Sequence, residues 1–467
     1  MKLFDRDDYR YSFFDGMCAN VYANLTGGAF LTGFALSLGM NDLMIGVLLA
    51  IPFIVTLFQI PGSYFICRKG RRKSLAYWTA TISRLLWLPL LVIGLLPFES
   101  SGWHPFLVLA CFLVLQAFSS VSYIAWISWT SDLVPDEIRG TFFGVRNMLC
   151  GAAGIASVLI FGNLLDILKA DFGRTTLIFG VPFGCAVIFG LMSSHFLKRI
   201  PDVLEARFDC KSFWQELLGP FRDQIFRRYL VFALCWNFSV HMATPFFFLY
   251  FLRELKYSYG FIAMLTTIAA LVDLFAVRFW GTISDRVKNK AVIQLTGWGV
   301  AFLPALWALV RPQDLLLPIV IQVLSGGFWA GVGLCTSNLQ LRISPQQGRV
   351  WFLSVYSITA GLGGAVAPIA GGLILSVLNH YAPTQTNGGA LSLHYIFIAS
   401  SLLRILSMLV LQFVREPQEK NLRQLFQALF GFQRSKLAVL QHAPAAAVPK
   451  VSLFMRAFKR PMARQQV

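Results

Sequence analysis

Three ionisable residues, Arg84, Asp273 and Arg404, stand inside long apolar runs of the sequence. A charged side chain at the centre of a membrane helix costs about 2.5–3.5 kcal/mol on insertion scales, so it faces the protein interior and pairs with another group. Asp273 is the carboxylate deepest within such a run, which makes it the candidate for proton coupling. The alternative is a static pair with Arg278, although a spacing of five residues is poor helical register.

Two pairs of polar side chains occur four residues apart in other apolar runs, Asn20 with Asn24 and Asn237 with His241. Residues at this spacing share one face of a helix. Amides bind hydroxyl groups, so both faces suit an uncharged polar ligand. The alternative is that these side chains bond across neighbouring helices, with His241 a hydrogen-bonded interior histidine rather than a proton carrier.

The composition places these residues in a membrane. Of 467 residues, 56% are hydrophobic and 13% are charged, whereas soluble domains contain about 25% charged residues. Twelve apolar stretches reach about the 20 residues that are needed to span a bilayer. We therefore predict an all-α integral membrane protein with two bundles of six transmembrane helices. The predicted spans are 13–39, 43–66, 75–97, 103–131, 142–168, 175–197, 229–252, 258–281, 291–310, 314–340, 349–379 and 391–414.

Basic residues are distributed unevenly over the predicted loops. With the N-terminus in the cytoplasm, 33 Lys and Arg residues fall on the cytoplasmic side and 5 fall outside. This distribution follows the positive-inside rule, so the net charge of +18 needs no nucleic acid as a partner. We expect a multi-pass protein of the cell (inner) membrane with both termini cytoplasmic. Its predicted parts are a first bundle over 1–197, an amphipathic connector over 198–228, a second bundle over 229–414 and a basic tail over 415–467.

The two halves of the sequence repeat each other weakly. At an offset of 210 residues, eight of the 31 positions in 135–165 are identical, beginning with Pro135 and Pro345. At an offset of 217, Asn20 aligns with Asn237. A parallel repeat of six helices allows two bundles to rock around a site at their interface.

Three loop segments carry sequence motifs. Residues 281–290 read GTISDRVKNK, which is similar to G-x-x-x-D-R-x-x-x-[KR], and residues 68–72 match the R-x-G-R-R end of the same motif, with Cys67 in place of its acid. Residues 132–146 read DLVPDEIRGTFFGVR. All three resemble loops of the major facilitator superfamily, the last of them in its bacterial permeases. The resemblance covers about residues 13–414.

The resemblance implies two sets of functional residues. Helices 1, 4, 7 and 10 of that superfamily line a central path, and the amides, hydroxyls and aromatic rings on them favour a sugar-like solute. The predicted substrate-binding residues are Asn20, Asn24, Gln116, Tyr123, Trp126, Asn237, His241, Gln322 and Trp329. An acid at a helix end that pairs with arginines across the interface holds one closed state. The predicted cytoplasmic gate consists of Arg68, Arg71, Asp132, Arg139, Arg146, Asp285 and Arg286. The alternative is that these residues only anchor helix ends on the cytoplasmic side, although for Asp285 and Arg286 the gate is favoured.

The sequence thus predicts a secondary transporter for a small polar solute that works by rocker-switch alternating access, with proton coupling if Asp273 titrates. The alternative is an exporter of amphipathic drugs or lipids by proton antiport, which the aromatic-rich helices favour. No clustered nucleophile, base and acid and no phosphate-binding loop supports an enzyme. We expect a monomer that needs no cofactor and no metal, with the solute, the lipid bilayer and H⁺ as its partners.

Overall fold

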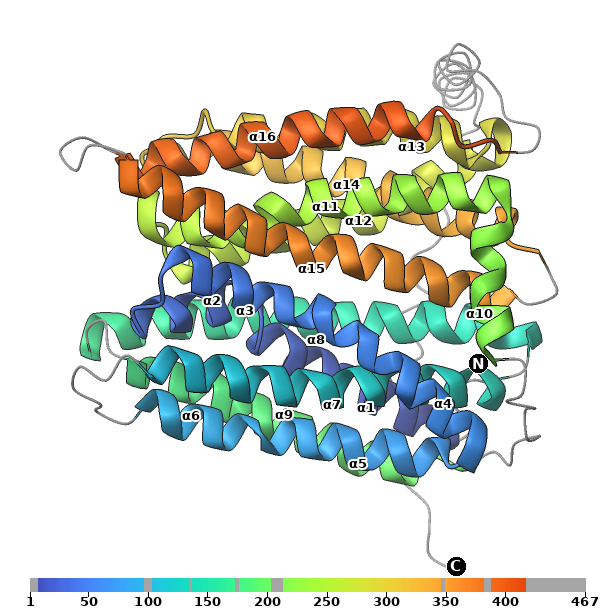
Figure 1. Ribbon diagram of the computed structural model, residues 1–467. Helices are drawn as coiled ribbons and strands as arrows, with labels where there is room; N and C mark the ends of the chain where they lie inside the picture. Colours follow the sequence, from blue (N-terminus) through green and yellow to red (C-terminus); the bar gives the residue numbers. More distant parts are fainter. Residues whose placement is uncertain are drawn as a thin grey trace, which may run out of the picture.

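The computed structural model describes residues 7–95, 103–134, 136–172, 176–202, 213–345, 349–381 and 388–416. The described residues are almost entirely helical, and no strand occurs among them. The helices form two bundles whose members run roughly along one common direction (Figure 1). The all-α prediction is therefore confirmed.

The first bundle runs to the end of α9. Its elements are α1 (Asp7–Leu25), α2 (Gly28–Ser37), α3 (Asp42–Ile54), η1 (Val55–Phe58), α4 (Gln59–Lys69), α5 (Arg72–Leu85), α6 (Trp87–Leu95), α7 (His104–Leu133), α8 (Asp136–Phe172), η2 (Thr176–Phe179) and α9 (Gly180–Arg199).

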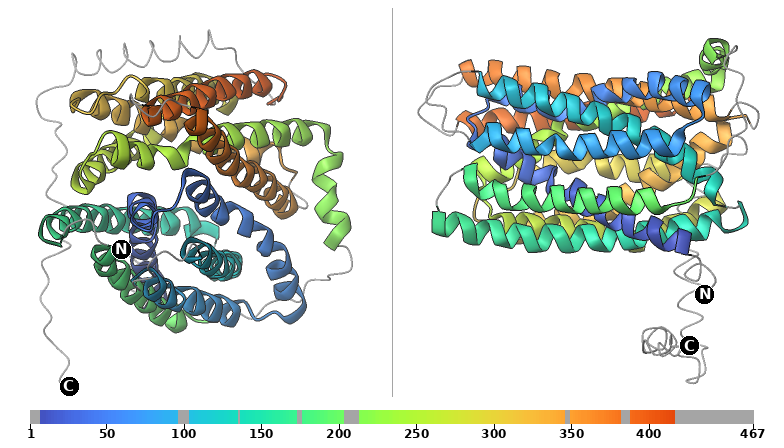
Figure 2. Two further views of the ribbon diagram at one scale, coloured as in Figure 1. Left: turned by 60° about the vertical axis from the view of Figure 1, so that its left-hand side comes forward. Right: turned by 90° about the horizontal axis from the view of Figure 1, so that it is seen from below.

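The second bundle follows a short helix, α10 (Phe213–Arg222), which stands across the other helices rather than parallel to them (Figure 2). Its elements are α11 (Gln224–Leu249), η4 (Tyr250–Glu254), α12 (Tyr259–Val287), α13 (Asn289–Trp307), α14 (Leu316–Ile343), α15 (Arg349–Tyr381) and α16 (Gly388–Leu411). The end of the molecule at which α10 lies is called the connector end below, and the end at which α2 lies is called the far end (Figure 1).

Ten helical segments of the described residues are long and apolar enough to cross a membrane. They correspond to ten of the twelve predicted spans. The remaining predicted spans, 13–39 and 291–310, fall on α1 with α2 and on α13, which do not meet the same criterion of length and composition.

The predicted span 13–39 is broken in the middle. Thr26 turns its hydroxyl back to the carbonyl of Tyr22 at 2.8 Å, and Gly28 has a φ of +52°, a left-handed conformation that glycine adopts without steric cost. The chain therefore leaves α1 and restarts as α2 within two residues. The amides at the start of α2 receive no side-chain cap from Gly27.

Aromatic side chains fill the cores of both bundles near the far end. In the first bundle, the Phe34 ring meets the Phe183 ring edge-on, with centroids 5.2 Å apart. In the second, Phe247 and Phe397 stack with centroids 4.7 Å apart. Such pairs add about 0.5–1.5 kcal/mol to the apolar area that they bury, so each bundle has its own packed core.

The two bundles meet mainly through two pairs of helices, α3 with α15 and α8 with α12. Small residues allow the close approach: a Cβ on Gly46 of α3 would lie 2.5 Å from the carbonyl oxygen of Pro368 on α15. On α8, a Cβ on Gly162 would lie 3.0 Å from the carbonyl oxygen of Tyr259. Both contacts belong to the far half of the molecule.

Candidate functional site

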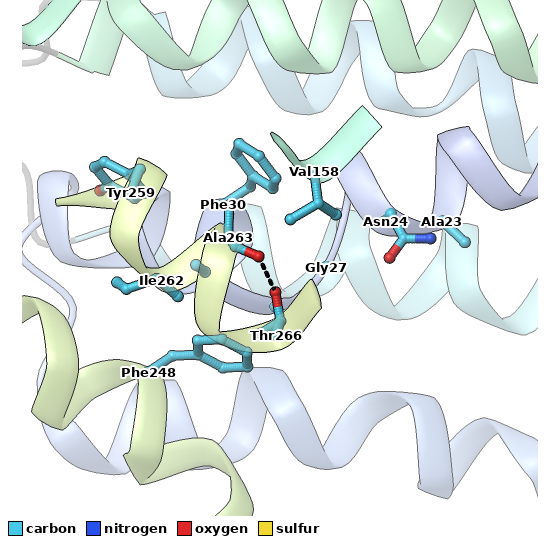
Figure 3. Close-up of a pocket in the computed structure, with 12 residues that line it drawn as sticks. Ala23, Asn24, Gly27, Phe30, Val158, Phe248, Tyr259, Ile262, Ala263 and Thr266 are labelled. Atoms are coloured by element: carbon cyan, nitrogen blue, oxygen red, sulfur yellow. Dashed lines mark hydrogen bonds between the residues drawn. The ribbon is translucent and has the colours of Figure 1, made fainter. Parts of the chain in front are cut away.

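A cavity of about 160 Å³ lies between the two bundles, beside the break between α1 and α2 (Figure 3). The first bundle contributes residues from both sides of the break and Val158 of α8. The second bundle contributes residues of α12 and Phe248 of α11. Because bundle proteins place ligands in cavities between their helices, this cavity is the candidate site.

The α1 wall of the cavity carries an amide. The Nδ2 of Asn24 donates to the carbonyl oxygen of Asn20 at 2.9 Å and to its side-chain Oδ1 at 2.5 Å. The two side chains thus share one face, as their spacing predicts. Gly154 of α8 leaves room for them, since a Cβ there would lie 2.6 Å from the Asn20 Oδ1. The side-chain oxygen of Asn24, Oδ1, remains available as an acceptor at the edge of the cavity (Figure 3).

The α12 wall carries a hydroxyl on an apolar surface. Thr266 donates its Oγ1 hydrogen to the carbonyl of Ala263 at 2.9 Å (Figure 3), which leaves the oxygen lone pairs for a ligand donor. The rings of Phe30 and Phe248 and the side chain of Ile262 complete the surroundings. The arrangement offers a few polar contacts and broad apolar faces, and it brings no nucleophile and base together.

Two carboxylates of the first bundle bond to groups of the second bundle at the far end. Asp166 of α8 accepts hydrogen bonds from the backbone amides of Tyr259 and Gly260, at 2.8 and 2.7 Å. These amides start α12, where the helix dipole favours an anion. The carboxylate therefore bonds the first bundle to the second.

The second carboxylate is Asp42, at the start of α3. Its Oδ1 lies 2.8 Å from Nη1 of Arg253, and its Oδ2 accepts from Nδ2 of Asn379 at 2.7 Å. Sequence reasoning did not assign a role to Asp42 or Asp166. The available signal was the position of both carboxylates at the outer ends of predicted spans.

Of the predicted substrate-binding residues, the structure brings Asn24 into the wall of this cavity, with Asn20 directly beside it. Asn237 instead donates to the carbonyl of Ala233 in its own helix, at 2.8 Å. His241 packs its ring against Phe53 of the other bundle, with centroids 4.3 Å apart.

The remaining predicted substrate residues belong to α7 and α14. Tyr123 is 57% exposed, and Trp126 lies beneath the guanidinium of Arg146. Trp329 packs against Trp236, with ring centroids 6.1 Å apart. Gln116 and Gln322 are half-buried. None of these five residues lines the cavity of Figure 3.

The three predicted intramembrane charges have different surroundings. Arg84 is buried and donates to Ser194 and, at 2.9 Å, to Ser193. Arg404 is also buried, but it donates to backbone carbonyls, with Nη1 3.1 Å from the oxygen of Val300 and Nη2 3.4 Å from that of Val240. Asp273 is half-buried in the middle of α12.

The predicted gate residues divide into two groups. Arg68, Arg71, Asp285 and Arg286 are exposed at the connector end. Arg146 lies inside the first bundle, where its side chain is 12% exposed. The side chains of Asp132 and Arg139 fall outside the described residues.

In the part of the chain that the structure describes, no group of three or more His, Cys, Asp or Glu side chains is placed to hold a metal ion. The polar atoms of the candidate site are amides and hydroxyls, which bind neutral or anionic groups more readily than a metal.

The sequence matches the profile of the Major Facilitator Superfamily over residues 13–351 and 229–463. Solved structures of transporters are similar in fold. One is the nucleoside transporter NupG, with a TM-score of 0.64 at 14% identity over 87% of this chain and 98% of that chain. The inward-open xylose transporter XylE from E. coli has a TM-score of 0.60 at 14% identity, over 90% and 98% of the two chains. A bacterial homologue of the iron transporter ferroportin, in an inward-facing state, has a TM-score of 0.62 at 14% identity, over 87% and 98%.

Proposed function

Because the chain belongs to the major facilitator superfamily, we propose that this multi-pass membrane transporter moves a small polar solute by rocker-switch alternating access. The proposal rests on the cavity between the bundles and on the bonds of Asp42 and Asp166, which join the bundles at the far end. If the bundles separate first at one end and then at the other, the cavity is exposed to one face of the membrane at a time.

The lining of the cavity supports a hydroxylated, sugar-like solute. Asn24 and Thr266 supply an amide and a hydroxyl from opposite bundles, and Phe30 and Phe248 supply ring faces. Amides and hydroxyls bond to hydroxyl groups, while aromatic faces cover the C–H side of a sugar ring. The predicted residues on α7, α11 and α14 would meet the solute farther along its path.

The second candidate is an exporter of amphipathic compounds. It is favoured by the apolar majority of the cavity lining, which includes Phe30, Val158, Phe248 and Ile262. A solute panel distinguishes the two candidates. It contains sugars, nucleosides, amino acids and lipophilic cations, and it is tested by thermal unfolding of the purified chain. A ligand at about 100 times its Kd stabilises by about 2.7 kcal/mol.

A matched pair of variants tests whether a solute from the panel binds in the cavity. Thr266→Val removes the hydroxyl from the cavity wall, whereas Thr282→Val removes a hydroxyl of the same helix that is exposed near the connector end. We expect Thr266→Val to weaken binding of a stabilising solute about fivefold, because one hydrogen bond contributes about 1 kcal/mol. Equal affinities of both variants and the wild type would contradict the assignment of this cavity.

We also propose that Asp273 couples transport to protons. Ala263, Thr266, Ala270 and Asp273 follow each other at three- and four-residue steps on α12, so they share one helix face. The carboxylate therefore continues the face that lines the cavity, and no ion-pair partner of Asp273 occurs among the described residues.

The test of coupling compares Asp273→Asn with Asp273→Glu in vesicles. The isosteric amide cannot exchange a proton, so it is expected to abolish uptake driven by a pH gradient while leaving solute exchange without a gradient intact. The glutamate variant keeps a titratable group and is expected to retain part of the pH-driven uptake. Undiminished pH-driven uptake by Asp273→Asn would remove this residue from coupling.

The connector end is proposed to face the cytoplasm, at the inner membrane of the cell. The support is the excess of Lys and Arg in the loops of that end, which the positive-inside rule assigns to the cytoplasm. A membrane-impermeant thiol reagent on intact cells tests this orientation. Single cysteines replacing Ser37 at the far end are expected to react, and those replacing Ser74 at the connector end are expected to remain unlabelled.

A further inference from the structure

A buried polar cluster lies inside the first bundle, between the cavity and the connector end. Ser193 of α9 donates to Oδ1 of Asp15 on α1 at 2.5 Å. The same hydroxyl accepts from Nη2 of Arg84 at 2.9 Å. Asp15 and Arg84 are thus held through Ser193, and a second serine accepts from Arg84 as well. This part of the cluster is hydrogen-bonded within the protein.

Arg146 of α8 completes the cluster but is poorly bonded. Its Nη2 lies 3.7 Å from Oδ2 of Asp15, beyond the usual range of a hydrogen bond of about 2.7–3.2 Å. Its Cζ lies 4.4 Å from the centroid of the Trp126 ring, so the guanidinium rests on the face of the indole. Gly16 permits this position, because a Cβ there would lie 2.8 Å from the Arg146 Cζ.

Two neighbouring donors at this place lack an acceptor. The Nε of Arg146 and the Nε1 of Trp126 are both buried without a hydrogen-bond partner. A buried donor without an acceptor costs about 1–3 kcal/mol, so two of them side by side require a partner such as a water, an ion or a ligand. The cluster also holds two guanidinium groups, Arg84 and Arg146, against the single carboxylate of Asp15. An anion would therefore supply both the missing acceptors and the missing charge.

Arg146 is connected to the cavity along α8. Arg146, Cys150, Gly154 and Val158 follow at four-residue spacing, so they share a face of the helix. Val158 lines the cavity, and Gly154 packs under Asn24. Arg146 therefore lies beyond Gly154 and Cys150 towards the connector end, on the part of α8 that packs against α1.

We propose that Arg146, supported by the Trp126 ring, binds an anionic group of the transported solute, which makes the solute a hydroxylated acid rather than a neutral sugar. This inference rests on the proposed transport function. A planar carboxylate offers two oxygens to the guanidinium fork, and a charge-assisted bond of this kind is about twice as strong as a neutral one. Arg146 was predicted from the sequence as part of the cytoplasmic gate, and the new role places it on the solute path.

The experiment uses matched acid and neutral pairs on the purified full-length chain. The probes are glucuronate with glucose, lactate with lactamide, and benzoate with benzamide, with inorganic phosphate as a further anion. Affinities come from the thermal shift as a function of concentration, for the wild type, Arg146→Gln, Arg146→Lys and Trp126→Phe. Lys198→Gln, which removes an exposed cation from α9, is the control for a general loss of positive charge.

We expect at least one acid to bind the wild type with a Kd more than ten times lower than the Kd of its neutral partner. Arg146→Gln is expected to abolish that difference, Arg146→Lys to reduce it about tenfold, and Trp126→Phe to weaken acid binding severalfold. Lys198→Gln is expected to leave the difference unchanged.

Other outcomes would overturn the inference. If the neutral partners bind and are transported equally well, transport stands but Arg146 does not select an anion. A preference for the acid that survives in Arg146→Gln, or the absence of an acid-specific shift from any probe in the wild type, would contradict the proposal directly. Circular dichroism and size-exclusion profiles that match the wild type show that a loss in Arg146→Gln does not come from misfolding, and Arg146→Lys provides the same test with the charge retained.

Discussion

The far end and the connector end of this molecule differ in how the two bundles meet. At the far end, the carboxylates of Asp42 and Asp166 are bonded to groups of the opposite bundle at 2.7–2.8 Å. At the connector end, Arg68, Arg71 and Asp285 are exposed, although motif residues of this kind are the ones that the superfamily resemblance assigns to a gate.

Helix packing shows the same difference. Along α15, close contacts with α3 and η1 run from Gly372, where a Cβ would lie 2.9 Å from the Asp42 carbonyl oxygen, to Gly361, where it would lie 2.6 Å from the Thr56 Oγ1. On the connector half of α8, a Cβ on Gly144 or Gly151 would meet nothing within 4 Å. In this structure the bundles are bonded to each other at the far end. We propose that the charged motifs of the connector end make the corresponding contact in another state.

The largest effect is expected from a wedge in the far-end contact. Gly46→Val places a branched side chain against the carbonyl of Pro368, 2.5 Å from its Cβ position. Overpacking of this kind costs about 1–3 kcal/mol, and here it can be relieved by separating α3 from α15. We expect the far end to open and transport to fall at least tenfold, measured as uptake in vesicles together with thiol labelling of Ser37→Cys.

The control for the wedge is Gly144→Val, the same substitution at a helical glycine with open space around its Cβ. It is expected to retain transport within about twofold. Equal losses in both variants would mean that the far-end contact has no special part in the cycle.

An intermediate effect is expected from Asp166→Asn. The amide keeps one oxygen for the amides of Tyr259 and Gly260 but loses the charge that the start of α12 favours. We expect the unfolding free energy to drop by about 1–2 kcal/mol and the far-end thiol of Ser37→Cys to react faster. Unchanged labelling would show that this bond does not hold the far end closed.

The smallest effect on stability is expected from Asp285→Asn at the connector end. Because the carboxylate is exposed, the free energy of unfolding should change by less than about 0.5 kcal/mol. Transport is nevertheless expected to fall, since the closed connector end would lose its acid. A cysteine in the connector half of α14, for example at Thr336, should become more accessible during turnover, and unchanged accessibility would contradict the gate.

The sequence predicted the helical class and the pairing of Asn20 with Asn24, because both follow from hydrophobic runs and from helical periodicity. The break at Gly27 and Gly28 was missed, since an apolar run of this length is equally compatible with one continuous helix. The far-end bonds of Asp42 and Asp166 were missed for a different reason. Hydropathy locates the spans in the sequence, but it gives no information on which loops contact each other across the interface between the bundles.

The place of Arg146 illustrates the same limit. Its motif, residues 132–146, was interpreted as a loop that overlaps the start of the predicted span 142–168. In the structure α8 begins at Asp136 and carries Arg146 into the bundle beside Asp15 and Trp126. A linear motif fixes the residue types but not the helix face on which they lie. That face depends on where the helix begins, the least reliable feature of a sequence-based assignment.

Two distances in one protein test whether one end of the molecule closes when the other end opens. Spin labels on Ser37 and Gln313 report the far end, and labels on Ser74 and Thr282 report the connector end; all four positions are exposed. The distances are measured by double electron–electron resonance in the wild type and in Gly46→Val. Alternating access predicts that the wedge lengthens the far-end distance and shortens the connector-end distance. A longer far-end distance with an unchanged connector-end distance would contradict alternating access by these two bundles.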